Sequence, residues 1–139
     1  MEINKIRIGN FLEWEDESHD IIKVSGIFQD YDGQYWISYG NKTEGLALEF
    51  VGVKLNDEWF YSAGFFNMNY GYEKDIEPDV TIRFICSDGK YYPQIEQISE
   101  SSYDPQMIVS LPYIEYVHEL QNIWAVVSGG ELVLVPPTH

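Results

Sequence analysis

Two Asp-Gly dipeptides, each set between runs of aromatic and β-branched residues, constrain the fold more than any other feature of this sequence. Asp32-Gly33 lies within IKVSGIFQDYDGQYWISYG, and Asp88-Gly89 lies within TIRFICSDGKYYPQIEQ. A two-residue type I′ loop needs positive φ at both positions, which Gly adopts freely and Asp tolerates. The sequence therefore predicts two antiparallel β-hairpins with two-residue loops.

The distance from each turn predicts which side chains share a face, because successive side chains of a strand point to opposite faces. The predicted core face of the first hairpin carries Val24, Phe28, Tyr35, Ile37 and Tyr39. Its other face carries Ile27, Gln29, Tyr31 and Trp36. On that second face, Tyr31 and Trp36 are expected to form a half-exposed aromatic platform.

The second hairpin has a more apolar inward face. This face carries Ile82, Phe84, Cys86, Tyr91 and Ile95. The opposite face carries Arg83, Ile85, Lys90, Tyr92 and Gln94. Cys86 is therefore interpreted as a small buried hydrophobic residue in preference to a reactive thiol.

Two further strands and a short helix are also predicted. Strands are predicted over Ile3 to Leu12 and over Glu131 to Val135, the latter ended by Pro136-Pro137 because proline cannot donate to a ladder. The segment LNDEWFYSAGF predicts a helix with Asn56 as N-cap and Gly64 at the left-handed position after its end. The segment from 65 to 79 is interpreted as a strand, FFNMNYGYEKD, that leads into an acidic, proline-containing loop.

A longer amphipathic helix is predicted near the C-terminus. Its apolar positions have the i, i+3, i+4, i+7 spacing of one buried stripe: Tyr113, Tyr116, Val117, Leu120, Ile123, Trp124 and Val127. Pro112 fits the first turn and Gly129 fits the position after the last. Such a helix of about 16 residues would be roughly 24 Å long and could cross a sheet.

His118, Gln121 and Asn122 lie beside this apolar stripe, and two interpretations of them stay open. They are either a helix flank that bonds neighbouring loops or a set of ligand contacts, with aromatic area from Tyr31, Tyr35, Trp36 and Trp124. Glu115, one predicted turn before His118, is expected to raise the pKa of the imidazole. No catalytic residue is assigned.

These elements predict an α+β fold in one domain over residues 1–139. We expect a small twisted antiparallel sheet or partly open barrel built from the two Asp-Gly hairpins. One short central helix and a C-terminal amphipathic helix packed on the sheet complete it.

Charge and cysteine content limit the partners and the location. The sequence has 23 acidic and 8 basic residues, a formal net charge of -15, and no Lys or Arg after Lys90. This charge disfavours direct binding to nucleic acid or anionic membranes. A single cysteine excludes an internal disulfide, and there is no signal-peptide-like or membrane-spanning apolar run, so we expect a cytoplasmic protein.

Motifs for metals, cofactors and catalysis are not recognisable. The three histidines are scattered, and no HExxH arrangement, Walker loop, Gly-rich dinucleotide fingerprint or G-x-S-x-G elbow occurs. The sequence therefore predicts neither a metal nor a cofactor. A phosphate-bearing ligand would require Arg7, Lys23 or Arg83 to converge against the overall negative charge.

Three segments, IRIGNFLEW, LNDEWFYSAGF and YVHELQNIWAVVSGGEL, resemble a group of small uncharacterised proteins encoded by phages and mobile elements of Bacteroidota. The matching residues are Arg7, Gly9, Asn10, Leu55, Trp59, Gly64, Phe65, Tyr116, Val117, His118, Leu120, Gln121, Asn122, Gly129, Glu131 and Leu132. The chain departs from the pattern at Ala125, where the group has an aromatic residue, and in the tyrosine-rich stretch Asp30 to Tyr39. The resemblance implies a phage or mobile-element origin and supplies no activity.

Two hypotheses follow for the function. The first is a noncatalytic binding protein that antagonises a host defence function by binding a small molecule or a basic host protein, in the cytoplasm of the bacterial host. The alternative is an acidic decoy, a nucleic-acid mimic or structural phage component that acts through its negative surface. The decoy requires carboxylates on one convex face without an aromatic-lined pocket, whereas ligand binding requires the pocket. Association of identical copies stays open.

Overall fold

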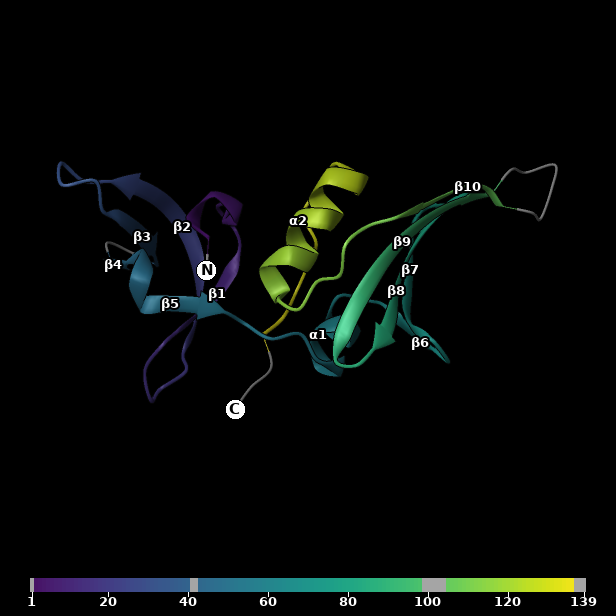
Figure 1. Cartoon of the computed structure of the whole chain (residues 1–139), viewed down its shortest axis with the longest axis horizontal. Coiled ribbons are helices and arrows are strands. Elements are labelled where there is room, and N and C mark those ends of the chain that lie inside the picture. The colour runs from purple at the N-terminus through teal and green to yellow at the C-terminus, as the bar shows by residue number, and fades with distance from the viewer. Residues whose placement is uncertain (1, 41–42, 99–104, 137–139) are drawn as a thin grey trace. The chain divides into compact units, whose positions relative to one another are not determined.

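The computed structural model describes residues 2–40, 43–98 and 105–136, which form two compact units with one five-stranded antiparallel sheet each (Figure 1). Unit 1 comprises Met1–Lys54 and Tyr116–Ile123, and unit 2 comprises Leu55–Glu115 and Trp124–His139. The predicted α+β class is confirmed, and neither sheet closes into a barrel within the described strands. The predicted single domain stays a prediction.

The sheet of unit 1 has the strand order β4-β3-β2-β1-β5. Its elements are η1 (Ile3–Lys5), β1 (Phe11–Trp14), β2 (Ile21–Gln29), β3 (Tyr35–Tyr39), β4 (Thr43–Leu46), η2 (Ala47–Glu49) and β5 (Phe50–Gly52). The buried core of the sheet is mainly aliphatic and consists of Ile6, Leu12, Ile22, Val24, Ile37 and Phe50. Of the opening strand expected over Ile3 to Leu12, only Phe11 and Leu12 lie in a strand, because a 3-10 turn and a loop with Gly9 at φ +95° precede β1.

The hairpin β2–β3 is confirmed, but its loop contains five residues, Asp30 to Gln34, instead of two. The Asp30 carboxylate holds this loop by accepting hydrogen bonds from the backbone N–H groups of Asp32 and Gln34, both at 2.9 Å, and from Trp36 Nε1 at 2.8 Å. The indole bond is the main reason that the pKa of the Asp30 carboxyl lies below its usual value. Gly33 supplies the positive φ, +84°.

The longer loop shifts the register, so the predicted inward position of Phe28 was wrong. Ile27 lies opposite Ile37 and Phe28 lies opposite Trp36, with an irregularity between Val24 and Gly26. Ile27 therefore packs against the core, while the Phe28 side chain is 41% exposed. A one-residue change of register moves every side chain of a strand to the other face, which explains the exchange.

The sheet of unit 2 has the order β10-β9-β8-β7-β6. Its strands are β6 (Phe66–Met68), β7 (Gly71–Glu77), β8 (Val80–Ser87), β9 (Lys90–Ile98) and β10 (Pro105–Ser110). The β8–β9 hairpin has the predicted two-residue loop, with φ +53° at Asp88 and +74° at Gly89. The pairs Ile82–Ile95, Phe84–Pro93 and Cys86–Tyr91 confirm the predicted inward face.

Cys86 lies on that inward face but is exposed, so the expectation that it is buried was wrong. It stands at the turn end of β8, whereas the fully buried side chains of this strand are Ile82 and Phe84. Side chains near the end of a strand have fewer neighbours to cover them. Alternation therefore predicted the direction of the thiol and not its exposure.

Helix α1 (Asp57–Ser62) matches the predicted short helix. The Asn56 side chain accepts a hydrogen bond from the Trp59 N–H at 3.3 Å, and Gly64 takes φ +84° after the end. The helix buries Phe60, whose ring stacks on Tyr72 with centroids 4.2 Å apart. Further rings around Phe60 belong to Phe65, Phe84 and Tyr91. Unit 2 therefore has an aromatic core.

Helix α2 (Val117–Ser128) is shorter than predicted and does not include Pro112. The chain before it is extended, because Ile114 bridges to Tyr91 and Tyr116 bridges to Lys54. The Glu119 side chain accepts from the Tyr116 N–H at 3.1 Å, which caps the helix start. Gly129, at φ +76°, ends it as predicted.

Val117, Leu120 and Trp124 on the predicted apolar stripe of α2 are buried. The helix contributes residues up to Ile123 to unit 1 and the remainder to unit 2. The strand expected over Glu131 to Val135 was wrong, since these residues form neither strand nor helix, and Pro137 lies outside the described residues. Neither helix in the described ranges has the length and apolar character needed to cross a membrane.

Candidate functional site

Among the cavities lined by described residues, one of about 580 Å³ in unit 1 is the best candidate for a ligand site. We call it the Tyr35 pocket, and its lining residues are Ile3, Glu15, Gly33, Gln34, Tyr35, Leu46, Ala47, Leu48, Phe50 and Val51. They come from the start of the chain, the residue after β1, the β2–β3 loop with the first residue of β3, and the segment from β4 to β5. Sheet pairing thus assembles the pocket from four separate stretches of sequence.

The aromatic wall of the Tyr35 pocket is fixed by packing behind it. Phe50 is 2% exposed, and its ring lies 4.3 Å from the Trp14 ring and 5.8 Å from the Tyr39 ring, between centroids. These rings rest against Gly45 of β4, where an added Cβ would come within 2.8 Å of Trp14 and 3.0 Å of Phe50. Because only glycine leaves room for these two rings, Gly45 is needed for the aromatic wall to form.

The chemistry of the Tyr35 pocket is apolar with one acidic group. Aliphatic side chains and the rings of Tyr35 and Phe50 provide most of the lining, and Gln34 adds an amide. Glu15 is the one charged side chain among the described lining residues. This composition suits a small molecule with an apolar body and one polar group.

Gln121, a predicted ligand contact, is used within unit 1. Its Oε1 accepts from the Phe11 N–H at 2.9 Å and from Asn10 Nδ2 at 3.4 Å, and its Nε2 donates to the Gly9 carbonyl at 2.9 Å. The side chain is 3% exposed. Its hydrogen bonds therefore join helix α2 to the chain just before and within β1.

Asn122, the second predicted contact, joins the same region. Its Oδ1 accepts from Arg7 Nε at 2.7 Å and from Asn10 Nδ2 at 2.9 Å, and its Nδ2 donates to the Lys5 carbonyl at 2.7 Å. Together with Gln121 it forms what we call the Asn10 cluster, consisting of Arg7, Asn10, Gln121 and Asn122. This bonding supports the helix-flank interpretation of the two amides.

His118, the third residue of the predicted polar flank, is 5% exposed and stacks on the Tyr116 ring, with centroids 5.7 Å apart. Burial lowers the pKa of its imidazole, and the charge of Glu119 offsets this only in part. The expected increase caused by Glu115 was therefore wrong. Its Nδ1 has no hydrogen-bond partner in the described part of the chain. Gly52 lets both rings approach β5, because a Cβ there would lie 2.8 Å from Tyr116.

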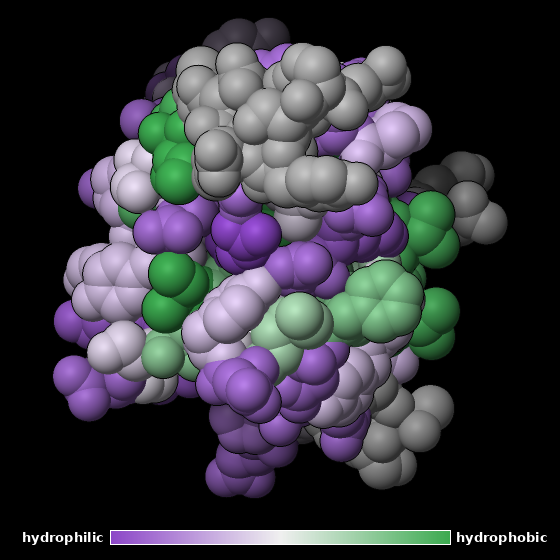
Figure 2. Space-filling view, turned by 90° about the vertical axis from the view of Figure 1, so that its right-hand side faces the viewer, coloured by the Kyte–Doolittle hydropathy of each residue, from purple (hydrophilic) through white to green (hydrophobic). Residues whose placement is uncertain are grey.

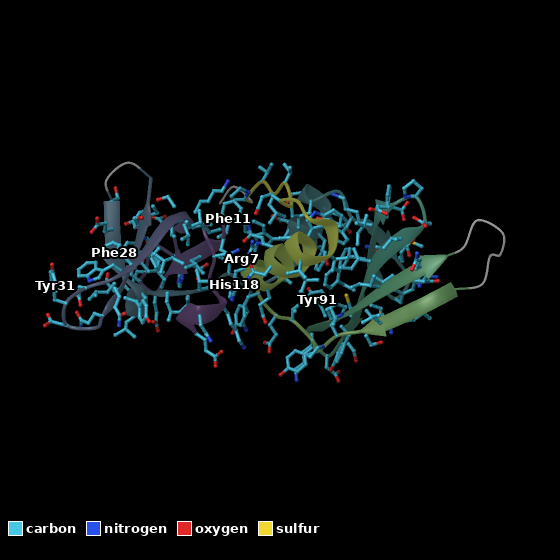
Figure 3. The ribbon with its side chains drawn as sticks, turned by 90° about the horizontal axis from the view of Figure 1, so that it is seen from above. Arg7, Phe11, Phe28, Tyr31, Tyr91 and His118 are labelled. Carbon is cyan, nitrogen blue, oxygen red and sulfur yellow. The ribbon has the colours of Figure 1, made fainter. Side chains whose placement is uncertain are left out.

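The predicted aromatic contacts are dispersed. Tyr35 lines the Tyr35 pocket, and Tyr31 is fully exposed at the tip of the β2–β3 hairpin, where Figure 3 also labels Phe28. Trp36 is half-buried beside Phe28, whose ring is nearly parallel to it at 6.3 Å, so the platform contains Phe28 in place of Tyr31. Trp124 packs in unit 2, with its ring 6.1 Å from Phe65.

Two of the basic groups that a phosphate ligand would need, Arg7 and Arg83, are bonded to other side chains. Arg7 bonds Asn122 in unit 1, whereas Arg83 of unit 2 pairs with Glu73 at 3.0 Å and with the buried Glu96. The carboxylates beside Arg83 offset its charge. Figure 2 shows a face of unit 2 on which hydrophobic side chains lie among strongly hydrophilic ones.

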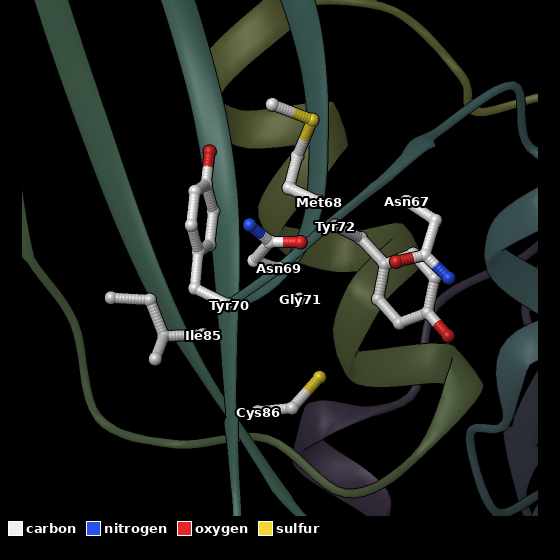
Figure 4. Close-up of a pocket in the computed structure, with 8 residues that line it drawn as sticks. All are labelled: Asn67, Met68, Asn69, Tyr70, Gly71, Tyr72, Ile85 and Cys86. Carbon is white, nitrogen blue, oxygen red and sulfur yellow. The ribbon is translucent and has the colours of Figure 1, made fainter.

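A second, more open pocket of about 340 Å³ lies in unit 2 (Figure 4). Its lining residues are Asn67, Met68, Asn69, Tyr70, Gly71, Tyr72, Ile85 and Cys86. Gly71 has φ +152°, and a Cβ there would overlap the Phe84 carbonyl oxygen. Desolvation raises the pKa of the Cys86 thiol, which disfavours the nucleophilic thiolate. This pocket lacks the features of a thiol active site.

Among the described residues, no group of three or more His, Cys, Asp and Glu side chains is placed to hold a metal ion. The sequence identified Tyr35 of the Tyr35 pocket but missed its other lining residues, because no motif marks them.

Comparison with known proteins matched no family model, no curated protein and no solved structure.

Proposed function

We propose that this chain is a noncatalytic binding protein that holds a small molecule in the Tyr35 pocket and thereby antagonises a host defence function. The observation that carries the proposal is the pocket itself. Its volume of about 580 Å³ lies within the range of about 300–1,000 Å³ that is usual for small-molecule sites. A mostly apolar lining with few polar groups is typical of such sites.

The rigidity of the lining supports ligand binding. Phe50 is held between Trp14 and Tyr39, so one wall is in place before a ligand arrives. Binding to a preformed wall avoids the entropic cost of ordering side chains. Tyr35 and Leu48, at 42% and 83% exposure, lie at the accessible side of the pocket and leave area for a ligand to cover.

The same pocket favours ligand binding over the acidic-decoy alternative. The decoy hypothesis requires a convex acidic face without an aromatic-lined pocket, and Tyr35 and Phe50 both line this one. A basic host protein is therefore the less favoured partner, although the net charge of -15 suits it.

The proposed origin is a phage or mobile element of Bacteroidota, and the proposed location is the cytoplasm of the bacterial host. Both rest on the sequence resemblance. In the structure, the Asn10 cluster bonds the Arg-x-Gly-Asn motif to the Gln-Asn pair. These motifs lie at opposite ends of the sequence but serve one contact.

The proposal is tested by two-dimensional ¹H–¹⁵N NMR with a library of small fragments. We expect fragments to shift amide signals around the Tyr35 pocket, and we expect Ala47→Trp to abolish these shifts by filling the cavity. Val126→Trp is the matched control, since Val126 is 84% exposed and lies on α2 outside the lining. Signals that stay unchanged, or shifts that persist in Ala47→Trp, would overturn the proposal.

A further inference from the structure

We propose that the Tyr35 pocket selects organic cations, molecules with an ammonium group on an apolar or aromatic body. This inference rests on the proposed function and names the class of its ligand. It follows from the charge, the aromatic rings and the placement of basic residues around the pocket.

The charge at the pocket is negative. Glu15 is exposed, and no described residue forms a salt bridge with its carboxylate. It belongs to the acidic run Glu13 to Asp20, and its N–H donates to the Glu49 carbonyl at 2.9 Å, which brings a second acidic residue to the same region. Acidic side chains concentrated beside an apolar cavity raise the local concentration of cations.

The aromatic rings favour the same class. Tyr35 lines the cavity and is 42% exposed, and an exposed aromatic face attracts an ammonium group by about 0.5–1 kcal/mol. The aliphatic side chains Ile3, Leu46 and Val51 provide area for an uncharged body. A cation with an apolar body can therefore use both kinds of surface at once.

Three basic side chains of unit 1 have contacts of their own outside the Tyr35 pocket. Arg7 bonds Asn122, Lys5 pairs with Glu2 at 3.1 Å, and Lys23 lies 5.9 Å from the centre of the Phe11 ring. None of them is among the described lining residues. An anionic ligand would therefore meet Glu15 with no positively charged side chain among the described lining residues.

Three probes with the same phenylethyl body test this inference: phenethylamine, 2-phenylethanol and 3-phenylpropionate. They carry a positive, a neutral and a negative group at pH 7. NMR titrations at low salt should give the amine about threefold to fivefold tighter binding than the alcohol, since one partly screened ion pair is added. The carboxylate should bind most weakly, and added salt should reduce the differences.

Two pairs of variants assign the preference to the pocket. Glu15→Gln should bring the amine to the affinity of the alcohol and leave the alcohol unchanged, whereas Glu17→Gln, in the same acidic run but outside the lining, should keep the preference. Tyr35→Ala should weaken all probes, and Tyr31→Ala should weaken none. Dispersed NMR spectra of each variant verify its fold.

The outcomes separate the two proposals. Equal affinities for the three probes, or tightest binding of 3-phenylpropionate, would overturn the cation inference and leave the proposed small-molecule function standing. A preference that persists in Glu15→Gln would also overturn it, because the charge would act elsewhere. If no probe and no library fragment shifts the amides around the pocket, both proposals fail.

Discussion

The two Asp-Gly hairpins share a sequence signature but have different turns. In β8–β9 the dipeptide forms a two-residue loop, whereas in β2–β3 it lies inside a five-residue loop. The difference comes from the residue two positions before the dipeptide. Asp30 accepts three hydrogen bonds that close the longer loop, and Cys86 occupies the corresponding place in the other hairpin. A turn dipeptide therefore predicts a hairpin, and its neighbours decide the loop length and the register.

The two units differ in what stabilises them. Unit 2 has a core of stacked aromatic rings around Phe60, whereas unit 1 has an aliphatic core joined to α2 through the buried amide of Gln121. Apolar burial is nondirectional, while a buried amide stabilises only when its partners are in place. We therefore expect truncation of a core side chain to lower the free energy of unfolding most in unit 2. Removal of one hydrogen-bonding side chain should lower it most in unit 1.

The largest expected effect is that of Phe60→Ala. Phe60 is fully buried and contacts several rings, so truncation should lower the free energy of unfolding of unit 2 by about 3–5 kcal/mol. Amide hydrogen exchange measured by NMR reports each unit separately. Phe66→Ala is the control, because Phe66 is 71% exposed and should cost less than about 0.5 kcal/mol. Equal losses in the two variants would contradict an aromatic core centred on Phe60.

Local signals in the sequence predicted several elements correctly. Helix α1 follows from Asn56 and Gly64 at its ends, and the β8–β9 register follows from the Asp88-Gly89 loop. The start of α2 could not be predicted this way. Pro112 favours a helix locally, but backbone pairing of Ile114 with Tyr91 keeps this stretch extended, and that pairing depends on tertiary structure.

The candidate site was harder to predict than the fold. The polar flank was conspicuous in the sequence, yet Gln121 and Asn122 bond the chain itself. The Tyr35 pocket joins Ile3, Glu15 and residues up to Val51, and none of its spacings forms a motif. Only sheet pairing brings these segments together, so periodicity identified Tyr35 as an aromatic candidate and gave no reason to connect it with Glu15.

The next largest effect is expected for Gln121→Ala. This change removes the acceptor of the Phe11 N–H and the donor to the Gly9 carbonyl in buried surroundings. The free energy of unfolding of unit 1 should fall by about 2–3 kcal/mol, since buried backbone groups lose partners. Gln29→Ala, which removes one exposed side-chain bond, is the control. If exchange in unit 1 is the same in both variants, the Asn10 cluster does not stabilise this unit.

Asp30→Ala tests the comparison of the two turns directly. Loss of its carboxylate removes the acceptor for two backbone N–H groups and the Trp36 indole, so we expect the β2–β3 hairpin to lose stability, by less than unit 1 loses in Gln121→Ala. Exchange should increase in the β2–β3 hairpin and stay unchanged in β8–β9. Asp32→Ala, in the same loop but without these side-chain bonds, should change little. A similar effect of both variants would show that the loop length has another cause.

The smallest effect concerns pH and again separates the units. Burial lowers the pKa of His118 in the folded state below its ordinary 6.5, so the unfolded chain binds more protons as the pH falls through 6.5. The free energy of unfolding of unit 1 should therefore fall as the pH decreases below 6.5, and His118 should contribute no more than about 1.4 kcal/mol per pH unit to this slope.

His118→Phe should remove the contribution of His118 to the slope, because a phenyl ring cannot be protonated. Unit 2 contains no histidine within its described residues and supplies the internal control in the same exchange experiment. An unchanged slope in His118→Phe would show that the buried imidazole does not govern this pH dependence.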